Sequence, residues 1–285
     1  MVSPARCRDA VRHLIRHFRV SERRACRALE INRSSLRYVA VPVDYEKRVV
    51  ERMNELAVAH PRWGYRMVAT LLRGEGWKVN PKRVLRLWRQ EGNRVLPKRS
   101  GAGGKRSAGS SRNAGWRLRA KHPQHIWGMD FMSSRTRRGG PIRILNIVDE
   151  FTRLALGCRV DLSIGTSDVM AELEELFLRY GKPKIIRCDN GREFVAATLM
   201  SWLTGLRIEQ AFIEKGQPQQ NCFVERFNGT MRSEVLDVED FDTVIEARVV
   251  LKHWSFEEYN NRRPHRGHGM LTPRQFADNW KAGGK

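Results

Sequence analysis

One stretch of the sequence, Lys98 to Gly115, constrains the fold more than any other feature. It reads KRSGAGGKRSAGSSRNAG, almost entirely Gly, Ser, Ala and basic residues without apolar periodicity. Such a composition cannot bury a core and is typical of a flexible linker. We therefore expect a linker over residues 98–120, with separate folded regions before and after it.

The charge of the chain is distributed unevenly about this linker. The 285 residues include 53 Lys and Arg against 31 Asp and Glu, a net charge of +22. Residues 1–120 hold 29 basic and 9 acidic residues, whereas residues 121–285 hold 24 and 22. This imbalance indicates a polyanionic partner and favours a nucleic-acid-binding region joined to a nearly neutral enzyme domain. A merely solubilising surface would mix the two signs.

Several classes of protein are excluded by the sequence. Its five cysteines are an odd number without Cys-x-x-Cys pairs, which argues against a disulfide framework and against a zinc finger. It has no run of 18 apolar residues and no signal-peptide core. We therefore expect a cytoplasmic protein without a membrane partner.

The first segment, residues 1–40, has the pattern of a helix-turn-helix. Apolar residues recur at helical spacing over 5–19, namely Val11, Leu14, Ile15 and Phe18. Ser21 can cap a second helix, and a third starts at Arg33. Because the last helix of such a unit enters the major groove, the expected DNA-binding residues are Arg33, Ser34, Ser35 and Arg37. A helical hairpin with a charged outer face is the alternative.

Residues 41–97 predict a second helical, helix-turn-helix-like region, with helices over 45–60, 65–75 and 81–91. The last helix is the best delimited, since Asn80 is a good N-cap, Pro81 suits the first helical position and Gly92 can end the helix. Its inward-facing side chains are expected to be Val84, Leu85, Leu87 and Trp88. Its phosphate contacts are expected to be Lys82, Arg83, Arg86 and Arg89.

Beyond the linker the pattern changes from helices to strands. Apolar runs over 126–132, 143–148 and 154–162 predict three antiparallel strands. The following elements are a helix over 166–180, a strand over 184–188, a helix over 193–204, a strand over 207–213 and a helix from about residue 220. This order predicts an α/β fold over 121–240, a ribonuclease-H-like mixed sheet flanked by helices, followed by a C-terminal helical extension over 241–285.

Three carboxylates in this region are candidates for a catalytic site. Asp130 lies in an apolar strand, where a charge persists only if it is paired or binds a metal, and a salt bridge is the alternative. Asp189 follows a strand, where ligands collect in α/β folds, although Asp-Asn-Gly also favours a simple turn. Glu225 belongs to a polar helical stripe, opposite an apolar one. The polar stripe is Asn221, Glu225, Asn228 and Arg232, and the apolar stripe is Phe223, Val224, Phe227 and Met231.

Two aspartates and a glutamate suit divalent metal chemistry. Mg²⁺ prefers oxygen ligands and takes few of them from protein. Two such ions, roughly 3.5 to 4 Å apart, can activate an attacking hydroxyl and stabilise the leaving oxygen of a phosphoryl transfer. A DNA backbone is a fitting substrate for that chemistry.

With these motifs the sequence resembles, along nearly its whole length, the OrfB-type transposases of bacterial insertion sequences of the IS-three group, relatives of retroviral integrases. Their signature is two aspartates and then a glutamate after 35 further residues, and 35 residues separate Asp189 from Glu225. The first aspartate stands in Trp127-Gly128-Met129-Asp130-Phe131. The segments Tyr259 to His265 and Leu271 to Pro273 resemble the family's C-terminal box, whereas Gln217 and Arg266 to His268 depart from its pattern.

The resemblance implies a transposase that binds two Mg²⁺ ions, or Mn²⁺ in their place, through Asp130, Asp189 and Glu225. It would cleave the ends of its element and join the freed 3′ hydroxyl to target DNA. The neighbours expected to shape the site are Asn190, Gly191, Asn221 and Asn228. The implied partners are double-stranded DNA (terminal repeats and target), further copies of the chain, and an upstream-frame DNA-binding protein. The alternatives are a nuclease that cuts without joining, and an inactive remnant or DNA-binding regulator.

Overall fold

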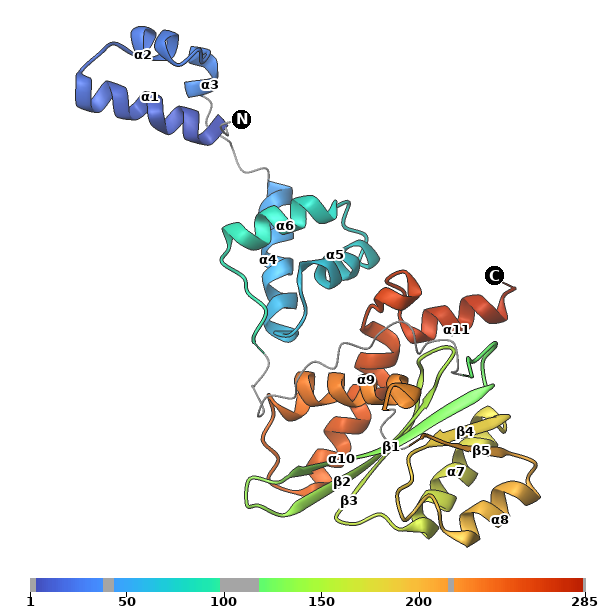
Figure 1. The fold of residues 1–285 in the computed structure, drawn as a ribbon. Coiled ribbons are helices and arrows are strands. Elements are labelled where there is room, and N and C mark those ends of the chain that lie inside the picture. The colour runs from blue at the N-terminus through green and yellow to red at the C-terminus, as the bar shows by residue number, and fades with distance from the viewer. Residues whose placement is uncertain (1–3, 38–43, 98–117, 215–217, 284–285) are drawn as a thin grey trace. The chain divides into compact units, whose positions relative to one another are not determined.

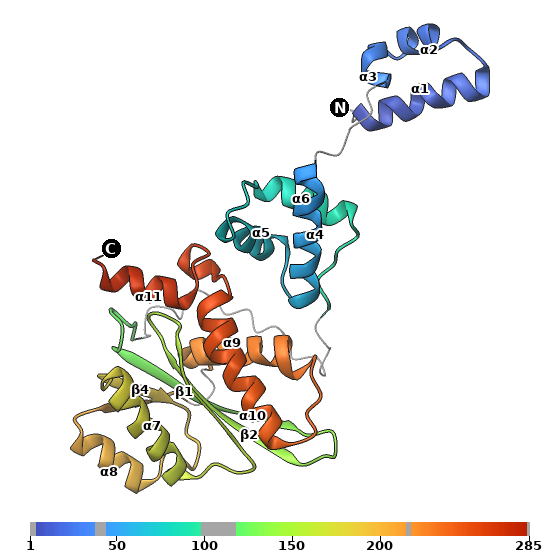
Figure 2. The ribbon, with the colours of Figure 1, turned by 180° about the vertical axis from the view of Figure 1, so that it is seen from behind.

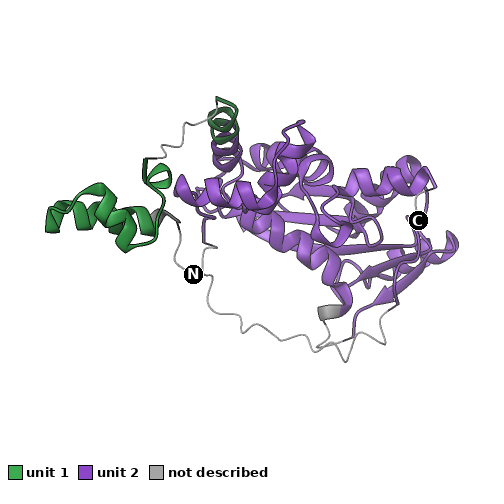
Figure 3. Ribbon diagram, turned by 90° about the horizontal axis from the view of Figure 1, so that it is seen from above, with its two compact units in different colours: residues 1–51 green, residues 52–285 purple. Residues whose placement is uncertain are grey.

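The computed structural model describes residues 4–37, 44–97, 118–214 and 218–283 (Figure 1). It divides into unit 1, Met1–Glu51, and unit 2, Arg52–Lys285 (Figure 3). Residues 98–117 of the expected linker, and Gln217, lie outside the described residues. In the described ranges, no helix combines the length and the apolar character needed to cross a bilayer.

Three helices begin the chain: α1 (Pro4–Phe18), α2 (Glu22–Ala28) and α3 (Arg33–Arg37). They share a small core of Val11, Ala25, Cys26 and Leu36. Ser21 caps α2 as predicted, because its Oγ accepts a hydrogen bond from the Arg24 amide at 3.4 Å. Phe18, the last of the apolar residues at helical spacing in α1, is 66% exposed, because the buried face of α1 stops at Ile15.

Three further helices follow: α4 (Asp44–Ala59), α5 (Tyr65–Gly74) and α6 (Pro81–Gln90). The predicted cap of α6 is confirmed, because Asn80 Oδ1 accepts a hydrogen bond from the Lys82 amide at 2.8 Å. Of its predicted inward residues, Val84, Leu87 and Trp88 are buried and Leu85 is half-buried.

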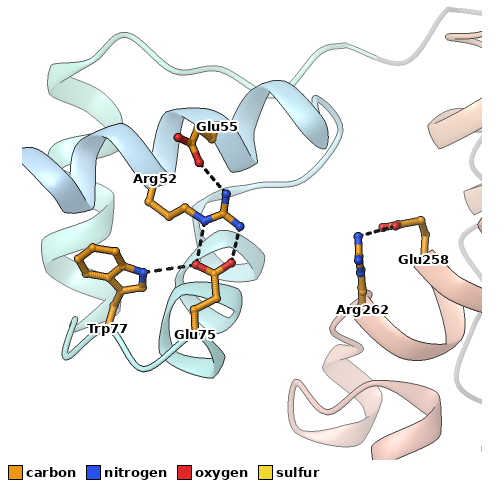
Figure 4. A network of polar contacts seen from close by, with 6 residues as sticks. All are labelled: Arg52, Glu55, Glu75, Trp77, Glu258 and Arg262. Atoms are coloured by element: carbon orange, nitrogen blue, oxygen red, sulfur yellow. Dashed lines mark hydrogen bonds and ion pairs between the residues drawn. The ribbon is translucent and has the colours of Figure 1, made fainter.

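A polar network joins α4 to the end of α5 (Figure 4). The Arg52 guanidinium donates to both carboxylate oxygens of Glu75, at 2.8 and 2.6 Å, and to Glu55 at 2.6 Å. The Trp77 indole also donates to Glu75, at 3.3 Å. A carboxylate that receives a two-pronged guanidinium contact is held in a fixed orientation. The network therefore fixes the loop after α5, which leads into α6.

Residues 126–212 form a five-stranded mixed sheet (Figure 1). Its strands are β1 (Ile126–Arg135), β2 (Pro141–Asp149), β3 (Ala155–Asp161), β4 (Ile185–Cys188) and β5 (Glu209–Phe212). The order is β3-β2-β1-β4-β5, antiparallel among the first three strands and parallel from β1 through β4 to β5. The predicted antiparallel strands and mixed sheet are confirmed.

Each face of the sheet has its own apolar core, because side chains alternate along the strands. One face packs against α7 (Thr166–Tyr180) and α8 (Ala197–Gly205). The other packs against α9 (Cys222–Met231) and α10 (Val244–His253), as Figures 1 and 2 show from opposite sides. A 3₁₀ turn, η2 (Pro218–Asn221), precedes α9, and the π-helical turn η3 (Arg232–Leu236) follows it.

The expected helix over 193–204 begins later, at Ala197. Phe194 is fully buried and its amide bonds to the Gly191 carbonyl at 2.9 Å, so residues 191–196 turn to insert this ring into the core. The ring stacks on Phe131 of β1, with centroids 4.9 Å apart.

The end of the chain packs against the sheet. It continues from α10 into η4 (Trp254–Arg262, π-helical), η5 (Arg266–His268, 3₁₀) and α11 (Pro273–Lys281). Asn260 is buried and its carboxamide makes two 2.9 Å hydrogen bonds to the backbone N–H and carbonyl of Ala155. Tyr259 packs edge-on against Phe227 of α9, with centroids 4.6 Å apart. The segment that resembles a C-terminal box thus fastens the start of β3 to α9.

Candidate active site

Two of the predicted carboxylates come from adjacent parallel strands. The β1–β4 register places Gly128 opposite Arg187. Asp130 lies two residues beyond Gly128, and Asp189 lies two residues beyond Arg187. Since alternate residues of a strand share a face, Asp130 lies on the same face as Gly128, which α9 covers, and Asp189 follows directly after the end of β4.

Glu225 comes from the first turn of α9, which packs across β1 and β2. The helix approaches closely because Gly128 has no side chain: a Cβ there would lie 3.2 Å from Asn221 Oδ1 and 3.6 Å from Val224. The close approach brings the third carboxylate near enough to Asp130 for its charge to act on that residue.

The buried face of α9 differs from the predicted stripe at two residues. Val224, Phe227 and Met231 are buried as expected, and so is Asn228. Phe223 is only half-buried, with the Arg153 guanidinium 3.1 Å from its ring centroid. Consecutive helical residues differ by about 100°, so a face that includes Asn228 leaves Phe223 at its edge. The prediction of an inward Phe223 is therefore wrong.

The three carboxylates interact electrostatically. The pKa of Asp130 is raised to about 6, first by burial and then by the negative charges of Asp189 and Glu225, against hydrogen bonds from the Phe131 backbone and Asn228 that lower it. Repulsion of this kind marks carboxylates that face a common region, and a cation there would relieve it. The donor set is all oxygen, which suits a hard divalent ion.

The three carboxylates do not form a complete metal-binding site by themselves. In the parts of the chain that the structure describes, no three Asp, Glu, His or Cys side chains lie close enough to form one. The three carboxylates therefore lie near enough to influence one another electrostatically, but not near enough for all three to bind one ion together.

The loop that carries Asp189 is held by local hydrogen bonds. Asp189 Oδ1 accepts a 3.0 Å bond from the Gly191 amide, the turn that Asp-Asn-Gly predicts. A Cβ on Gly191 would lie 3.0 Å from that same oxygen, so a larger residue would displace the Asp189 carboxylate by a few tenths of an ångström. Asn190 Nδ2 donates to the Ile213 carbonyl at 3.0 Å, beyond the end of β5. The turn and the aspartate thus occupy the same loop.

Two asparagines join α9 and the turn before it to the strands. Asn221 is buried and its Nδ2 donates to the Met129 carbonyl of β1 at 3.1 Å. Asn228 Nδ2 donates to Asp130 Oδ2 at 2.8 Å. The four residues predicted to shape the site thus adjoin the catalytic candidates.

Comparison with known proteins identifies the family. Models of the integrase core domain match residues 120–218 and 206–273, and a model of an HTH-like domain matches residues 44–100. The "Insertion element IS476 uncharacterized 39.2 kDa protein" of Xanthomonas euvesicatoria is 35% identical over 280 residues, 98% of this chain and 79% of the relative. The "Insertion element IS407 uncharacterized 31.7 kDa protein" of Burkholderia multivorans is 35% identical over 264 residues, 92% of each chain. The chain belongs to the insertion-sequence transposase family. A solved structure, "Structure of the HTLV-2 integrase catalytic core domain in complex with magnesium (trimeric form)", is 18% identical over 56% of this chain and 99% of that chain, with a TM-score of 0.44.

Membership of the transposase family confirms the predicted α/β fold with a ribonuclease-H-like mixed sheet, preceded by a helical DNA-binding region. The HTH-like match falls on α4 to α6. On α6, Lys82, Arg86 and Arg89 are exposed and Arg83 is half-buried, positions compatible with phosphate contact. Their individual roles stay predictions.

The DNA-binding residues predicted on α3 have protein contacts in this structure. The Nε atoms of Arg33 and Arg37 both donate to Glu22 Oε1, at 3.0 and 2.9 Å. These bonds lower the pKa of the Glu22 carboxyl. Ser34 and Ser35 are exposed. The helix has five residues, so the ion pairs tie a short α3 to the start of α2.

Sequence reasoning missed four residues of the transposase core. Asn146 is completely buried in β2 and bonds to Asn228. Gly128 sets the approach of α9, and Arg187 of β4 forms a buried ion pair with Glu150. One signal was available: a lone Asn in the apolar run Ile144-Leu145-Asn146-Ile147-Val148 requires a polar partner.

Proposed function

We propose that this transposase cleaves the ends of its insertion element and joins them to target DNA, with Asp130, Asp189 and Glu225 holding divalent cations. The observation that supports the proposal is the proximity of three carboxylates, from β1, from the loop after β4 and from α9, two of which raise the pKa of the third. Three carboxylates provide the all-oxygen donor set that a two-cation phosphoryl transfer requires.

Each residue has a distinct role in this proposal. Asp130 and Asp189, fixed by neighbouring strands, would bind the cations. Glu225 would complete the ligand set from the first turn of α9. When bound, Mg²⁺ or Mn²⁺ would supply Lewis-acid activation of the attacking oxygen and charge stabilisation of the leaving oxygen. We propose two ions per site on the same chemistry.

The protein residues around the carboxylates would control geometry. Gly191 and the Asp189 turn hold one carboxylate at the end of β4, and Asn228 holds another by its 2.8 Å bond to Asp130. Fixed ligands lower the reorganisation needed in the transition state. Basic residues of the HTH-like region would hold the flanking DNA by its phosphates.

Joining two ends to one target implies that at least two copies act together on DNA. We propose a homo-oligomer on double-stranded terminal repeats, aided by an upstream-frame DNA-binding protein where one is made. Light scattering of the chain with and without end DNA tests this, since a complex that holds a single copy would contradict it.

A joining assay separates the proposed function from its alternatives. Labelled element-end DNA is incubated with Mg²⁺ or Mn²⁺ and wild type, Asp189→Asn or Glu225→Gln. Matched controls are Asp278→Asn and Glu174→Gln, which remove exposed carboxylates on α11 and α7. We expect joined products from wild type and controls, and a loss of at least about 1,000-fold in the two site variants.

The other outcomes point elsewhere. Metal-dependent cutting without joining would identify a nuclease. Specific DNA binding without cutting, with the upstream-frame protein present, would identify a remnant or a regulator. Joining that survives both site substitutions would contradict the three-carboxylate assignment.

A further inference from the structure

Asn146 is a polar residue in a place where packing favours an apolar one. It is 0% exposed in the middle of β2, on the face whose core includes Met132, Val148 and Met231. Its Nδ2 lies 3.3 Å from the Met132 sulfur and 3.8 Å from the Met231 sulfur. Among the described residues its Oδ1 has no hydrogen-bond partner. Burying a half-satisfied carboxamide costs free energy that leucine, of similar size, would not incur.

A short chain of hydrogen bonds leads from Asn146 to the active site. Asn146 stands directly opposite Asp130 in the β1–β2 register. Its Nδ2 donates to Asn228 Oδ1 at 2.7 Å, and Asn228 Nδ2 donates to Asp130 Oδ2 at 2.8 Å. Both bonds have good lengths. Three residues from β2, α9 and β1 thus form one relay, which we call the carboxamide relay.

The direction of the carboxamide relay follows from the groups themselves. An ionised carboxylate only accepts hydrogen bonds, so Asn228 must turn its NH₂ group toward Asp130. The Asn228 oxygen then faces Asn146, which must in turn present its own NH₂ group. Rotating either amide by 180° would set oxygen against oxygen. Asn146 therefore selects one of the two orientations of Asn228.

We propose that Asn146 is a positioning residue of the active site, which locks the Asn228 carboxamide and, through it, the Asp130 carboxylate in the orientation that binds a divalent cation. The involvement of a cation rests on the proposed function, whereas the orientation of Asn228 does not. The free energy lost by burying Asn146 is then offset functionally, because the Asp130 carboxylate is held in one orientation. Outer-shell partners of this kind typically tune metal affinity by about 10- to 100-fold.

The first test measures Mn²⁺ affinity of the full chain, by electron paramagnetic resonance of free Mn²⁺, together with the thermal unfolding midpoint. The variants are Asn146→Leu, Asn228→Leu, the double variant and Cys158→Ala. Cys158 is the matched control, because it is buried on the same sheet face and pairs with Asn146 across β2 and β3 without joining the relay. We expect Asn146→Leu to weaken Mn²⁺ binding about 10-fold with the fold retained, and Cys158→Ala to leave it unchanged.

The double variant distinguishes a relay from two separate contributions. If Asn146 acts only through Asn228, Asn146→Leu adds nothing once Asn228 is Leu, so the double variant should match Asn228→Leu. Effects that multiply would overturn the proposal. So would wild-type Mn²⁺ affinity in a folded Asn146→Leu protein.

A second measurement needs no metal. Side-chain NH₂ exchange of Asn228, followed by NMR on asparagine-labelled protein, should accelerate about 10-fold in Asn146→Leu, because Asn228 loses the contact that fixes it. Unchanged exchange in this variant would overturn the relay. If wild type itself binds no Mn²⁺, the proposed function fails, and this exchange experiment alone decides the role of Asn146.

Discussion

At the scale of single residues, the site depends on how closely α9 can approach β1. A Cβ on Gly128 would lie 3.2 Å from Asn221 Oδ1, and a Cβ on Gly191 would lie 3.0 Å from Asp189 Oδ1, so both glycines leave room that a side chain would fill. The catalytic candidates were predictable, because a charged residue within an apolar strand and a fixed spacing are visible in sequence. Asn146 and Gly128 were not singled out, since their roles depend on contacts with residues more than 80 positions away.

Gly128→Ala should reduce joining activity more than it reduces stability. The new Cβ would meet Asn221 Oδ1 at 3.2 Å, so α9 must shift by a few tenths of an ångström and carry Glu225 with it. We expect roughly a 10-fold lower joining rate and a destabilisation of about 1 kcal/mol. Gly205→Ala is the control, because a Cβ there meets nothing within 4 Å. Equal joining rates for Gly128→Ala and Gly205→Ala would show that the close approach of α9 to Gly128 does not matter for activity.

His268 should make the fold sensitive to acid. It is 8% exposed, stacked 3.9 Å from the Phe276 ring, with Nε2 3.1 Å from the Thr152 carbonyl. Burial, and then the Arg153 charge, lower its pKa to about 4. In the unfolded chain the His268 imidazole takes up a proton near pH 6.5, whereas in the folded chain it does so only near pH 4. The free energy of unfolding is therefore at its full value above pH 6.5 and falls as the pH is lowered toward 4.

The test compares unfolding midpoints across that range. Between pH 6.5 and 4 the free energy of unfolding should fall by up to about 3 kcal/mol less in His268→Gln than in wild type. His13→Gln, at an exposed position on α1, should follow wild type. Parallel pH profiles for wild type and His268→Gln would contradict the assignment.

At the scale of elements, a buried ion pair holds the segments around the site together. The pair joins Arg187 of β4 to Glu150, next to the end of β2, with 2.7 Å between Arg187 Nη1 and Glu150 Oε1. Their side chains are 5% and 0% exposed. Arg187 also donates to the carbonyls of Leu118, at 2.8 Å, and Gln220, at 3.1 Å. Strands and helices were largely predictable from periodicity. The start of α8 at Ala197, later than predicted, and the contacts of Arg187 were not predictable, because both depend on tertiary packing.

Arg187→Met should destabilise the fold strongly, because it leaves Glu150 buried without its partner. We expect a loss of about 3–5 kcal/mol in chemical unfolding, part of which Glu150→Gln should restore in the double variant. The control is Arg262→Met, which breaks the pair with Glu258 shown in Figure 4, where the Arg262 side chain is 67% and the Glu258 side chain 18% exposed, and which should cost about 1 kcal/mol. Equal losses in Arg187→Met and Arg262→Met would show that burial of the pair is unimportant.

At the scale of the whole molecule, the boundaries 1–40, 41–97, 98–120, 121–240 and 241–285 remain a prediction. The contacts of the last segment bear on it: Asn260 bonds to Ala155, Tyr259 packs on Phe227, and Arg263 pairs with Glu234 at 2.8 Å. Pattern alone showed that this segment is helical. It could not show that its buried face lies against the sheet.

A chain ending at residue 240 should therefore lose cooperative folding of its core. The truncation exposes the apolar face formed by β3 and α9, and burial of such a face is the main source of stability. Calorimetry of the truncated and full chains checks this. A truncated chain with the full chain's unfolding transition would show that 241–285 is a dispensable extension.

The most direct test of the central claim is the anomalous scattering of Mn²⁺ in crystals of this transposase bound to element-end DNA. We predict Mn²⁺ peaks in contact with carboxylate oxygens of Asp130, Asp189 and Glu225, and weakened or lost Mn²⁺ scattering in Asp189→Asn. Mn²⁺ bound only elsewhere, with these three carboxylates free of metal, would contradict the account.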